Sequence, residues 1–389
     1  GTRPHPCYIP ENEFRKLRTM IRMYRRVAGV GLALTMLVAG CGHSSSTSQG
    51  PATSSTPVPS VATSSTRAAS ATSQAARDLP DPHTLRGLTE VPELPDPKPV
   101  EGSSAQKLPV TVTDVEGNKV TIKSTSRILA LDLYGTLSRT LIGLGLGDKI
   151  VGRTVSSTEK QLHDRPVVTE NGHVLNVEAV AGLKPSVIIA DRSVGPKEAL
   201  DQLRKSGIPV VLVDPHRSVG STPQLIRTIA DAVGKPDAGE ALVKRTQEQI
   251  DQAKKQIAAW KPAKPMRVAF LYVRGNAGVF FILGSENGAS ELIQGVGADD
   301  VASDKGITTL VPANAESLVS INPDAIFVMR DGLASTGGMK GLLARAGVAN
   351  TTAGRKQRVI SIPDGISLSF GPQTGEVLTA VAKALYGVK

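Results

Sequence analysis

Residues 237–259 read DAGEALVKRTQEQIDQAKKQIAA, a run that has apolar side chains at helical spacing and no internal proline. Proline-containing segments bound it at 234–236 and at 261–262. The pattern predicts one helix of about 23 residues, about 35 Å long at 1.5 Å per residue. A helix of that length can connect two separate lobes.

Short buried strands and helical stretches alternate on both sides of this helix. Before it, the strands are expected at 128–131, 187–190 and 210–213, and the helices at 137–144 and 223–233. After it, strands are expected at 267–273, 325–329 and 359–362. A hairpin with strands at 110–113 and 119–122 opens the folded region. We therefore expect an α/β protein with two lobes of parallel sheet flanked by helices, at 108–235 and 263–389, joined by a helix over 236–262.

The first 41 residues have the pattern of a secretory signal. Three arginines precede an apolar run at 27–39, and small residues then lead into Cys41. About 13 apolar residues are fewer than the roughly 18–20 that span a membrane, which argues against a transmembrane anchor. The end of the run resembles the bacterial lipobox, which implies cleavage before Cys41 and lipid on its thiol. We predict a signal peptide over 1–40, and we interpret 1–19 as a mis-assigned start because Met20 or Met23 could begin it.

Residues 41–107 are expected to form a lipid-bearing tether. From residue 42 to about 80 the chain is Ser, Thr, Ala, Pro and Gln with few large apolar side chains, a composition that cannot offset its ordering entropy. A proline-punctuated, weakly structured stretch is expected to follow to about 106. Since the only cysteines are Cys7 and Cys41, the exported domain should contain no disulfide.

The net charge of +10 overstates the charge of the exported protein. Residues 1–41 contribute seven basic and two acidic residues, which leaves +5 for the remainder. Aromatic residues make up 3% of the chain, whereas binders of single-stranded nucleic acid need stacking platforms. Charge and composition therefore do not indicate a nucleic-acid partner.

Two segments echo one another. Glu178 and Glu316 each lie seven residues before a proline, and a buried apolar strand follows each proline. The first of these segments, residues 175–189 (LNVEAVAGLKPSVII), resembles the signature of substrate-binding proteins of ABC importers for iron–siderophores, cobalamin and haem. The resemblance covers about residues 108–389. It implies two lobes joined by a rigid helix, and a non-enzymatic receptor that works with an ABC permease and its ATPase.

Ligands of open α/β sheets collect beyond the carboxyl ends of the strands. Tyr272 and Arg274 end one predicted strand and, with a period of two, share one face about 7 Å apart. A phenolate is a donor suited to ferric iron and a known axial haem ligand. A neighbouring guanidinium favours the ionised phenol. An ordinary strand tyrosine beside a solvent-reaching arginine is the alternative interpretation.

His173 lies in a polar loop of the first lobe, before a helix for which Asn176 is the expected N-cap. Most single loop histidines are simply exposed. However, a histidine and a tyrosine from opposing lobes could together clamp a flat macrocycle. His173, Tyr272 and Arg274 together resemble the pattern of haem-binding lipoproteins of actinobacterial haem importers. That resemblance implies ferric haem b as the cargo, with His173 and Tyr272 on its iron and Arg274 supporting the tyrosine.

Four further positions are candidates for contact with the ligand. Met329 ends a predicted strand and corresponds, in the resemblance, to a methionine that packs on the porphyrin; packing in the core is the alternative interpretation. Tyr134 and Arg153 follow two first-lobe strands and are candidates for ring contact and propionate pairing. Residues 370–376 (FGPQTGE) are similar to a Gly-Pro-Arg-Thr segment of haem receptors, but Gln373 replaces the arginine. This departure puts propionate binding there in doubt.

The resemblance also implies how the receptor meets its partners. Each lobe would offer a surface carboxylate to arginines of the permease, and Glu198 and Asp331 are the candidates. We expect a monomer at the extracytoplasmic face of the cell membrane, held there only by its lipid. Surface haem-donor proteins could supply the cargo.

Three other functions were weighed. A ferric siderophore or cobalamin on the same scaffold would need no axial donors. Direct zinc or manganese binding is disfavoured because His163, His173 and His216 are not closely spaced. A secreted hydrolase is disfavoured because the sequence has no Gly-x-Ser-x-Gly elbow, phosphate loop or cysteine nucleophile.

Overall fold

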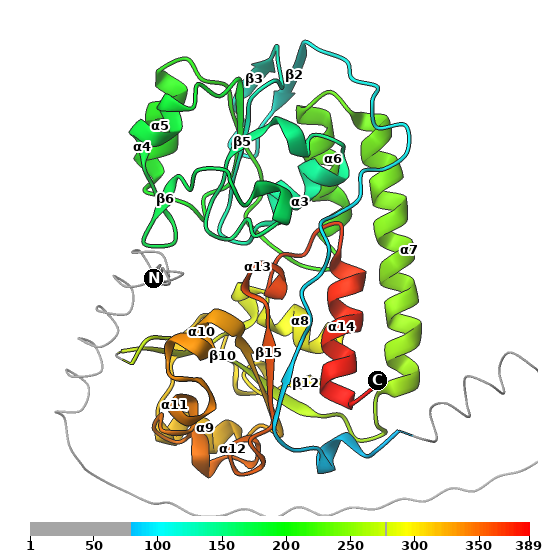
Figure 1. Ribbon diagram of the computed structural model, residues 1–389, viewed down its shortest axis with the longest axis vertical. Helices are drawn as coiled ribbons and strands as arrows, with labels where there is room; N and C mark the ends of the chain where they lie inside the picture. The colour runs from blue at the N-terminus through cyan, green and yellow to red at the C-terminus, as the bar shows by residue number, and fades with distance from the viewer. Residues whose placement is uncertain (1–78, 277) are drawn as a thin grey trace, which may run out of the picture. The chain divides into compact units, whose positions relative to one another are not determined.

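The computed structural model describes residues 79–276 and 278–389 (Figure 1). Its first lobe is built on a four-stranded parallel sheet. The sheet has the order β5-β4-β8-β9, with β4 (Ile128–Leu131), β5 (Ile150–Gly152), β8 (Val187–Ala190) and β9 (Val210–Leu212). Alternate residues of β4 enter different cores, Ile128 and Ala130 in one and Leu129 and Leu131 in the other. Both faces are therefore covered, as a parallel sheet requires.

Helices cover this sheet on both faces, and short hairpins lie at its margins. The helices are α3 (Thr136–Gly143), α4 (Val177–Gly182), α5 (Lys197–Lys205) and α6 (Thr222–Ala232), with 3-10 turns η2 (Gly147–Lys149) and η3 (Lys160–Leu162). The hairpins are β2 (Val110–Thr113) with β3 (Lys119–Ile122), and β6 (Thr169–Glu170) with β7 (Val174–Leu175). The hairpin predicted at 110–122 is confirmed, and the predicted helices are shifted by one residue.

The second lobe contains a seven-stranded mixed sheet. Its order is β1-β15-β14-β10-β11-β13, and β12 also pairs with β10. The strands are β1 (Leu88–Glu90), β10 (Arg267–Arg274), β11 (Val279–Ile282), β12 (Asp299–Asp300), β13 (Val311–Pro312), β14 (Ala325–Met329) and β15 (Val359–Ile362). β10, β14 and β15 run parallel, as predicted, whereas β11 is antiparallel to β10. The chain reverses after β10 at Gly275, whose φ of 59° suits glycine.

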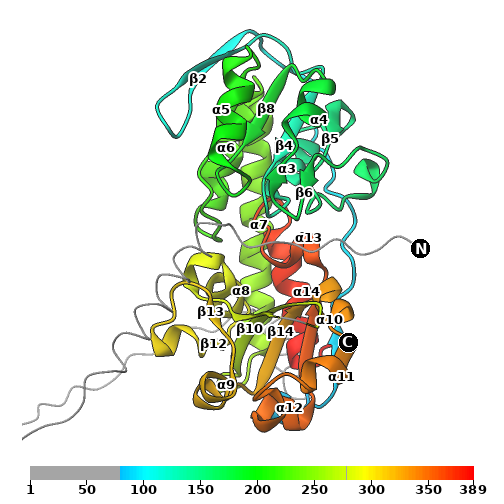
Figure 2. The same ribbon diagram turned by 90° about the vertical axis from the view of Figure 1, so that its left-hand side faces the viewer.

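The helices of this lobe are mostly short. They are α8 (Ala289–Gly295), α9 (Ala315–Ile321), α10 (Arg330–Ser335), α11 (Gly338–Leu343), α12 (Thr352–Lys356), α13 (Asp364–Ser367) and α14 (Thr374–Tyr386). The 3-10 turns are η4 (Ser285–Asn287), η5 (Ser303–Lys305) and η6 (Val348–Asn350). α10 and α13 lie at the edge of the lobe that faces the first lobe, in both views (Figures 1 and 2).

The predicted linking helix is confirmed as α7 (Pro236–Trp260), 25 residues long. It packs on α6 of the first lobe and on α14 of the second. Glycine permits a close approach at both crossings. A Cβ on Gly239 would lie 2.4 Å from that of Ala230, and a Cβ on Gly375 would lie 2.5 Å from the backbone of Gln249. Such tight packing on both lobes makes α7 a stiff connection.

The expected tether is wrong for residues 79–107, which belong to the folded body. Here η1 (Pro82–Thr84) leads into β1, which pairs in parallel with β15. The chain then passes to the first lobe, where Val100 donates its N–H to Gly143 and the Asp96 carboxylate accepts the backbone N–H groups of Lys160 and Gln161. Val91 and Val100 are buried, and carbonyl groups of the segment accept hydrogen bonds from the side chains of Arg330, Arg245 and Gln373. The signal peptide, Cys41 and the tether to residue 78 lie outside the described residues.

The two echo segments share one local structure. Asn176 and Asn314 cap α4 and α9 with their side chains. Lys184 and Asn322 then adopt positive φ, a proline follows, and β8 or β14 begins shortly after. The predicted helix–proline–strand repeat is confirmed.

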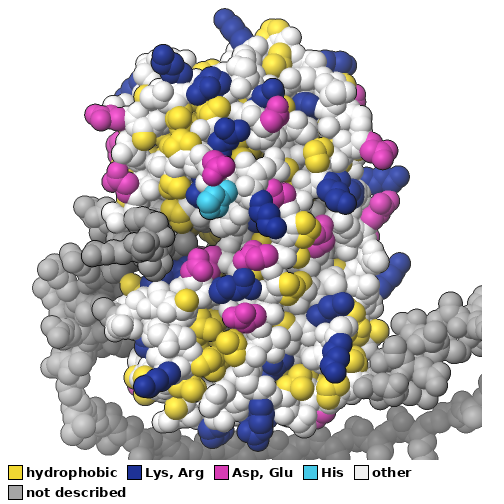
Figure 3. Space-filling view, in the orientation of Figure 1, with side chains coloured by type: hydrophobic (Ala, Val, Ile, Leu, Met, Phe, Trp, Pro, Cys, Tyr) yellow, Lys and Arg dark blue, Asp and Glu magenta, His cyan; other side chains and the backbone are white. Residues whose placement is uncertain are grey.

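Two surface properties concern the membrane and nucleic acid. Within the described ranges, no helix is both long enough and apolar enough to cross a bilayer. Figure 3 shows acidic and basic side chains interspersed over one face, so the positive charge forms no continuous patch on that face.

Candidate ligand-binding site

The carboxyl ends of three parallel strands bring a polar cluster together in the second lobe. Tyr272 and Arg274 end β10, Met329 ends β14, and Asp364 lies two residues beyond β15. Tyr272 and Arg274 are each 6% exposed, and the Arg274 guanidinium carbon lies 5.1 Å from the centre of the Tyr272 ring. The period-two prediction that these two residues share a face is consistent with this contact.

The Arg274 guanidinium contacts a residue at the end of β14 and a residue just beyond β15. Its Nη2 donates to Oδ2 of Asp364 at 2.5 Å and lies 3.4 Å from the sulfur of Met329. Burial raises the pKa of the Asp364 carboxyl, and the charge of Arg274 opposes that rise. Sequence reasoning found Tyr272, Arg274 and Met329 but missed Asp364. The signal that could have found it is a carboxylate two residues after the strand predicted at 359–362.

His173 is presented by the first lobe. It occupies the turn between β6 and β7, is 7% exposed, and accepts the N–H of Gly195 on its backbone carbonyl at 2.9 Å. Asn171 and Gly172 adopt positive φ to make this turn. The β6 hairpin lies at the edge of the first lobe that faces the second (Figures 1 and 2). His173 is therefore a buried turn residue rather than the exposed loop histidine of the alternative interpretation.

The strand ends of the first lobe carry a different cluster, which sequence reasoning missed. Asp132 follows β4, Asp191 follows β8, and both carboxylates accept hydrogen bonds from Arg217. All three residues are buried. The guanidinium of Arg217 also lies 5.4 Å from the ring centre of Tyr134. Two carboxylates that share one guanidinium leave the cluster with an excess of negative charge when all are ionised.

Tyr134 and Arg153, predicted as pocket residues, have contacts within their own lobe. Burial raises the pKa of Tyr134 to about 12, so its phenol stays protonated at neutral pH. Arg153 is partly buried, and its Nη1 lies 3.4 Å from the carbonyl of Thr154 in the same loop. These contacts are all within the protein, so the roles of Tyr134 and Arg153 in ligand binding stay predictions.

Gln373, the departure from the haem-receptor pattern, is buried between the lobes. Its Oε1 accepts from Arg139 at 2.6 Å, and its Nε2 donates to the carbonyl of Pro95 at 2.8 Å. A further bond joins the lobes nearby, from Thr136 to the carbonyl of Ser369. Gln373 therefore serves an interlobe contact here.

The candidate docking carboxylates are both exposed. Glu198 lies in the first turn of α5 and Asp331 in the first turn of α10. The backbone N–H of Asp331 donates to Oδ1 of Asp364 at 2.8 Å. The second-lobe candidate is thus one hydrogen bond away from the polar cluster at Arg274.

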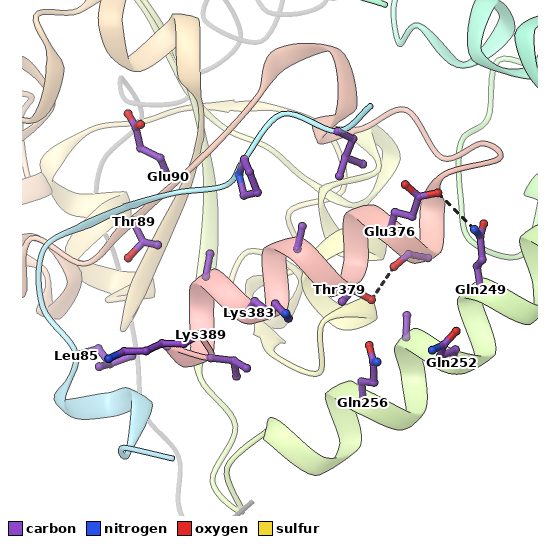
Figure 4. Close-up of a pocket in the computed structure, with 18 of the residues that line it drawn as sticks. Leu85, Thr89, Glu90, Gln249, Gln252, Gln256, Glu376, Thr379, Lys383 and Lys389 are labelled. Carbon is purple, nitrogen blue, oxygen red and sulfur yellow. Dashed lines mark hydrogen bonds between the residues drawn. The ribbon is translucent and has the colours of Figure 1, made fainter. Parts of the chain in front are cut away.

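A cavity of about 800 Å³ lies elsewhere, between the β1 segment, α7 and α14 (Figure 4). Gln249, Gln252 and Gln256 line one wall, and Glu376 and Lys383 line another. The described residues that line it include no histidine, tyrosine, methionine or cysteine. It offers none of the side chains expected to hold haem iron. Across residues 79–276 and 278–389, no cluster of three or more His, Cys, Asp or Glu could hold a bare metal ion.

Two α/β lobes, a stiff connecting helix and polar side chains at the strand ends define a bilobal binding protein. The chain belongs to the periplasmic binding protein family, whose model matches residues 133–365. Members of this family bind and hand over substrates, and no enzymatic activity is implied.

Individual relatives narrow the comparison. The crystal structure of a haem-binding protein, HmuT, is 49% identical, with a TM-score of 0.78, and the match covers 80% of this chain and all of that one. The apo form of RhuT, a periplasmic haem-binding protein from Roseiflexus sp. RS-1, is 32% identical over 68% of this chain and 99% of its own, with a TM-score of 0.64. An ABC transporter substrate-binding lipoprotein of unassigned function, YvrC of Bacillus subtilis (strain 168), is 27% identical over 72% of this chain and 86% of its own.

Proposed function

We propose that this protein captures ferric haem b between its two lobes and delivers it to an ABC permease. Tyr272 would supply a phenolate to the haem iron from one side, and His173 an imidazole from the other. The observation that carries the proposal is the contact between Tyr272 and Arg274, because a guanidinium over the ring stabilises the ionised phenol. The haem-binding relatives and the burial of His173 at the facing edge of the first lobe support the same assignment.

The other parts of the proposal concern location and delivery. The lipobox-like sequence supports a lipid anchor at Cys41 on the extracytoplasmic face of the membrane, and the name of the Bacillus subtilis relative supports it too. The exposed carboxylates of Glu198 and Asp331 would meet arginines of the permease, one on each lobe. Haem-donor proteins at the surface could load the receptor.

Titration of the purified protein with hemin tests the proposal. We expect a saturable shift of the Soret band at a stoichiometry of one, which Tyr272→Ala and His173→Ala should each alter. His163→Ala is the matched control, because the His163 side chain is 84% exposed and pairs only with neighbouring Asp164 among its described contacts. If Tyr272→Ala and His173→Ala both bind hemin as the parent does, these two residues are not the iron ligands.

Cobalamin is the second candidate, because a cobalamin-binding protein of Halobacterium salinarum is 24% identical over 75% of this chain and 78% of its own. Cobalamin would need no tyrosinate. Competition between cyanocobalamin and hemin for the parent protein therefore separates the two cargoes. Tight cobalamin binding that survives Tyr272→Ala would favour this alternative.

A further inference from the structure

Asp364 uses its two carboxylate oxygens for two different elements. Oδ2 pairs with Arg274, which lies over the Tyr272 ring, while Oδ1 accepts the backbone N–H of Asp331 in the first turn of α10. The Asp364 side chain is 12% exposed and that of Arg274 is 6% exposed, so water competes little for the bond between them. The Asp364 carboxylate therefore links the start of α10 to the guanidinium of Arg274.

The first turn of α10 also rests directly on Arg274. A Cβ on Gly332 would lie 2.5 Å from Nη1 of Arg274 and 2.5 Å from the carbonyl oxygen of Val273. Met329, the N-cap residue of α10, places its sulfur 3.4 Å from Nη2 of the same guanidinium. Two direct contacts, from Met329 and Gly332, and one indirect link through Asp364 thus join the start of α10 to Arg274, so a shift of this turn should disturb the guanidinium.

The exposed residue of this turn is Asp331, the carboxylate expected to meet the transporter. A cationic partner surface that binds Asp331 acts on a backbone whose N–H is held by Asp364. The path from the surface then has three steps, from Asp331 to Asp364, on to Arg274, and from its guanidinium to the tyrosine ring. The first two steps are hydrogen bonds, of which the ion pair between Asp364 and Arg274 lies between mostly buried side chains, and the third is a cation–π contact.

We propose that Asp364 is a positioning residue that couples the first turn of α10 to Arg274, so that a cationic protein partner engaging Asp331 loosens Arg274 from Tyr272 and promotes haem release. This inference rests on the proposed function, because it assumes that Tyr272 holds the haem. It adds a route by which docking of the permease would weaken the contact of Arg274 with Tyr272, the residue proposed to bind the iron. Without the guanidinium the phenol is harder to ionise, so a proton competes better with iron for its oxygen. The tyrosine should then leave the iron more readily.

Transfer of haem from the loaded protein to excess apomyoglobin measures the release rate. We expect Asp364→Asn to release haem about tenfold faster, since one charged hydrogen bond is lost while the side-chain shape is kept. The control is Asp300→Asn, another buried carboxylate of this lobe, which accepts from Ser290 and from the N–H of Ala302. That control should change the rate less than about twofold.

A double-mutant cycle separates positioning from a general effect on the fold. In an Arg274→Ala background, Asp364→Asn should add less than a twofold change, because its effect runs through Arg274. A full effect in that background, or no effect of Asp364→Asn in the parent, overturns the proposal. If Tyr272→Ala leaves the spectrum and the release rate unchanged, the proposed function has failed instead, and the two failures are distinct.

Gly332→Ala tests the contribution of α10. Its added methyl group must push the turn away from Arg274, so we expect faster haem release. The matched control is Gly182→Ala in α4, where a Cβ meets nothing within 4 Å. Alanine favours a helix over glycine, so propensity alone would stabilise both variants. Equal release rates for the two variants would exclude transmission through α10, and thermal unfolding of the apo proteins verifies that both are folded.

Discussion

The amide oxygen of Gln373 accepts a 2.6 Å hydrogen bond from the guanidinium of Arg139, which lies 234 residues earlier in the chain and in the other lobe. Arg139 is buried, and Glu159 lies 3.8 Å from its Nε as a partial counter-charge. An arginine at position 373, as in the haem receptors that the segment resembles, would bring a second guanidinium against the first. Glutamine satisfies Arg139 without adding a charge between the lobes.

Gln373→Arg should therefore destabilise the protein. Two guanidinium groups would meet in a buried space, where Glu159 beside Arg139 and Glu376, 3.3 Å from Nε2 of Gln373, balance them only in part. The expected fall in the free energy of unfolding is about 1–3 kcal/mol. Urea unfolding measures it, and Gln252→Arg, at an exposed position of α7, is the control. If the two variants unfold at the same urea concentration, the interlobe contact is unimportant for stability.

Residues 79–107 should be required for the stability of both lobes. A chain that begins at Leu108, the boundary expected from sequence, lacks β1, the buried Val91 and Val100, and the partner that Thr89 gives Arg358. Burial of the two valines alone is worth about 3–6 kcal/mol. We expect the shorter chain to unfold at a clearly lower temperature than one that begins at Leu79. Equal melting temperatures would mean that residues 79–107 contribute nothing measurable to the stability of the fold.

The fold could be predicted where a strand is a continuous apolar run. β4, β8, β14 and β15 have the predicted bounds because each is a mostly apolar run, interrupted only by Ser361 in β15, that both faces of a sheet can bury. β1 could not be found in this way, since Leu-Thr-Glu has no apolar pattern and its partner β15 lies about 270 residues further on. Its strand conformation comes from tertiary pairing.

The site was predictable to a similar degree. The alternation of side chains along a strand placed Tyr272 and Arg274 on one face, and the strand-end rule directed attention to Met329. The partners of these residues depend on how separate strands are ordered in the sheet. Asp364 reaches Arg274 only because β15 lies beside β14 and β14 beside β10. No local pattern in the sequence contains that order.

The stability of the first lobe should depend on the ionisation of Asp191. Burial raises the pKa of this carboxyl from 3.8 to about 6, and the nearby charge of Asp132 adds to the rise while Arg217 opposes it. Between these pH values the folded protein binds more protons than the unfolded chain, so the free energy of unfolding falls as pH rises.

The comparison with Asp191→Asn isolates this effect. From pH 4 to pH 6.5 we expect the parent to lose stability relative to the variant, by at most about 1 kcal/mol per pH unit for one proton. Urea unfolding at several pH values provides the measurement. Parallel pH profiles for the two proteins would mean that Asp191 has an ordinary pKa in the folded state.

Met329 should support haem through packing rather than through a bond to iron. Its sulfur already lies 3.4 Å from Arg274, and the residue ends β14 beside the polar cluster. Met329→Leu keeps the volume, so we expect the Soret band to stay unchanged and the release rate to change less than about twofold. Met329→Ala removes the packing and should release haem several-fold faster. A shifted Soret band in the leucine variant would instead mean that the thioether binds the iron, and Tyr272 would then lose its place as the second-lobe ligand.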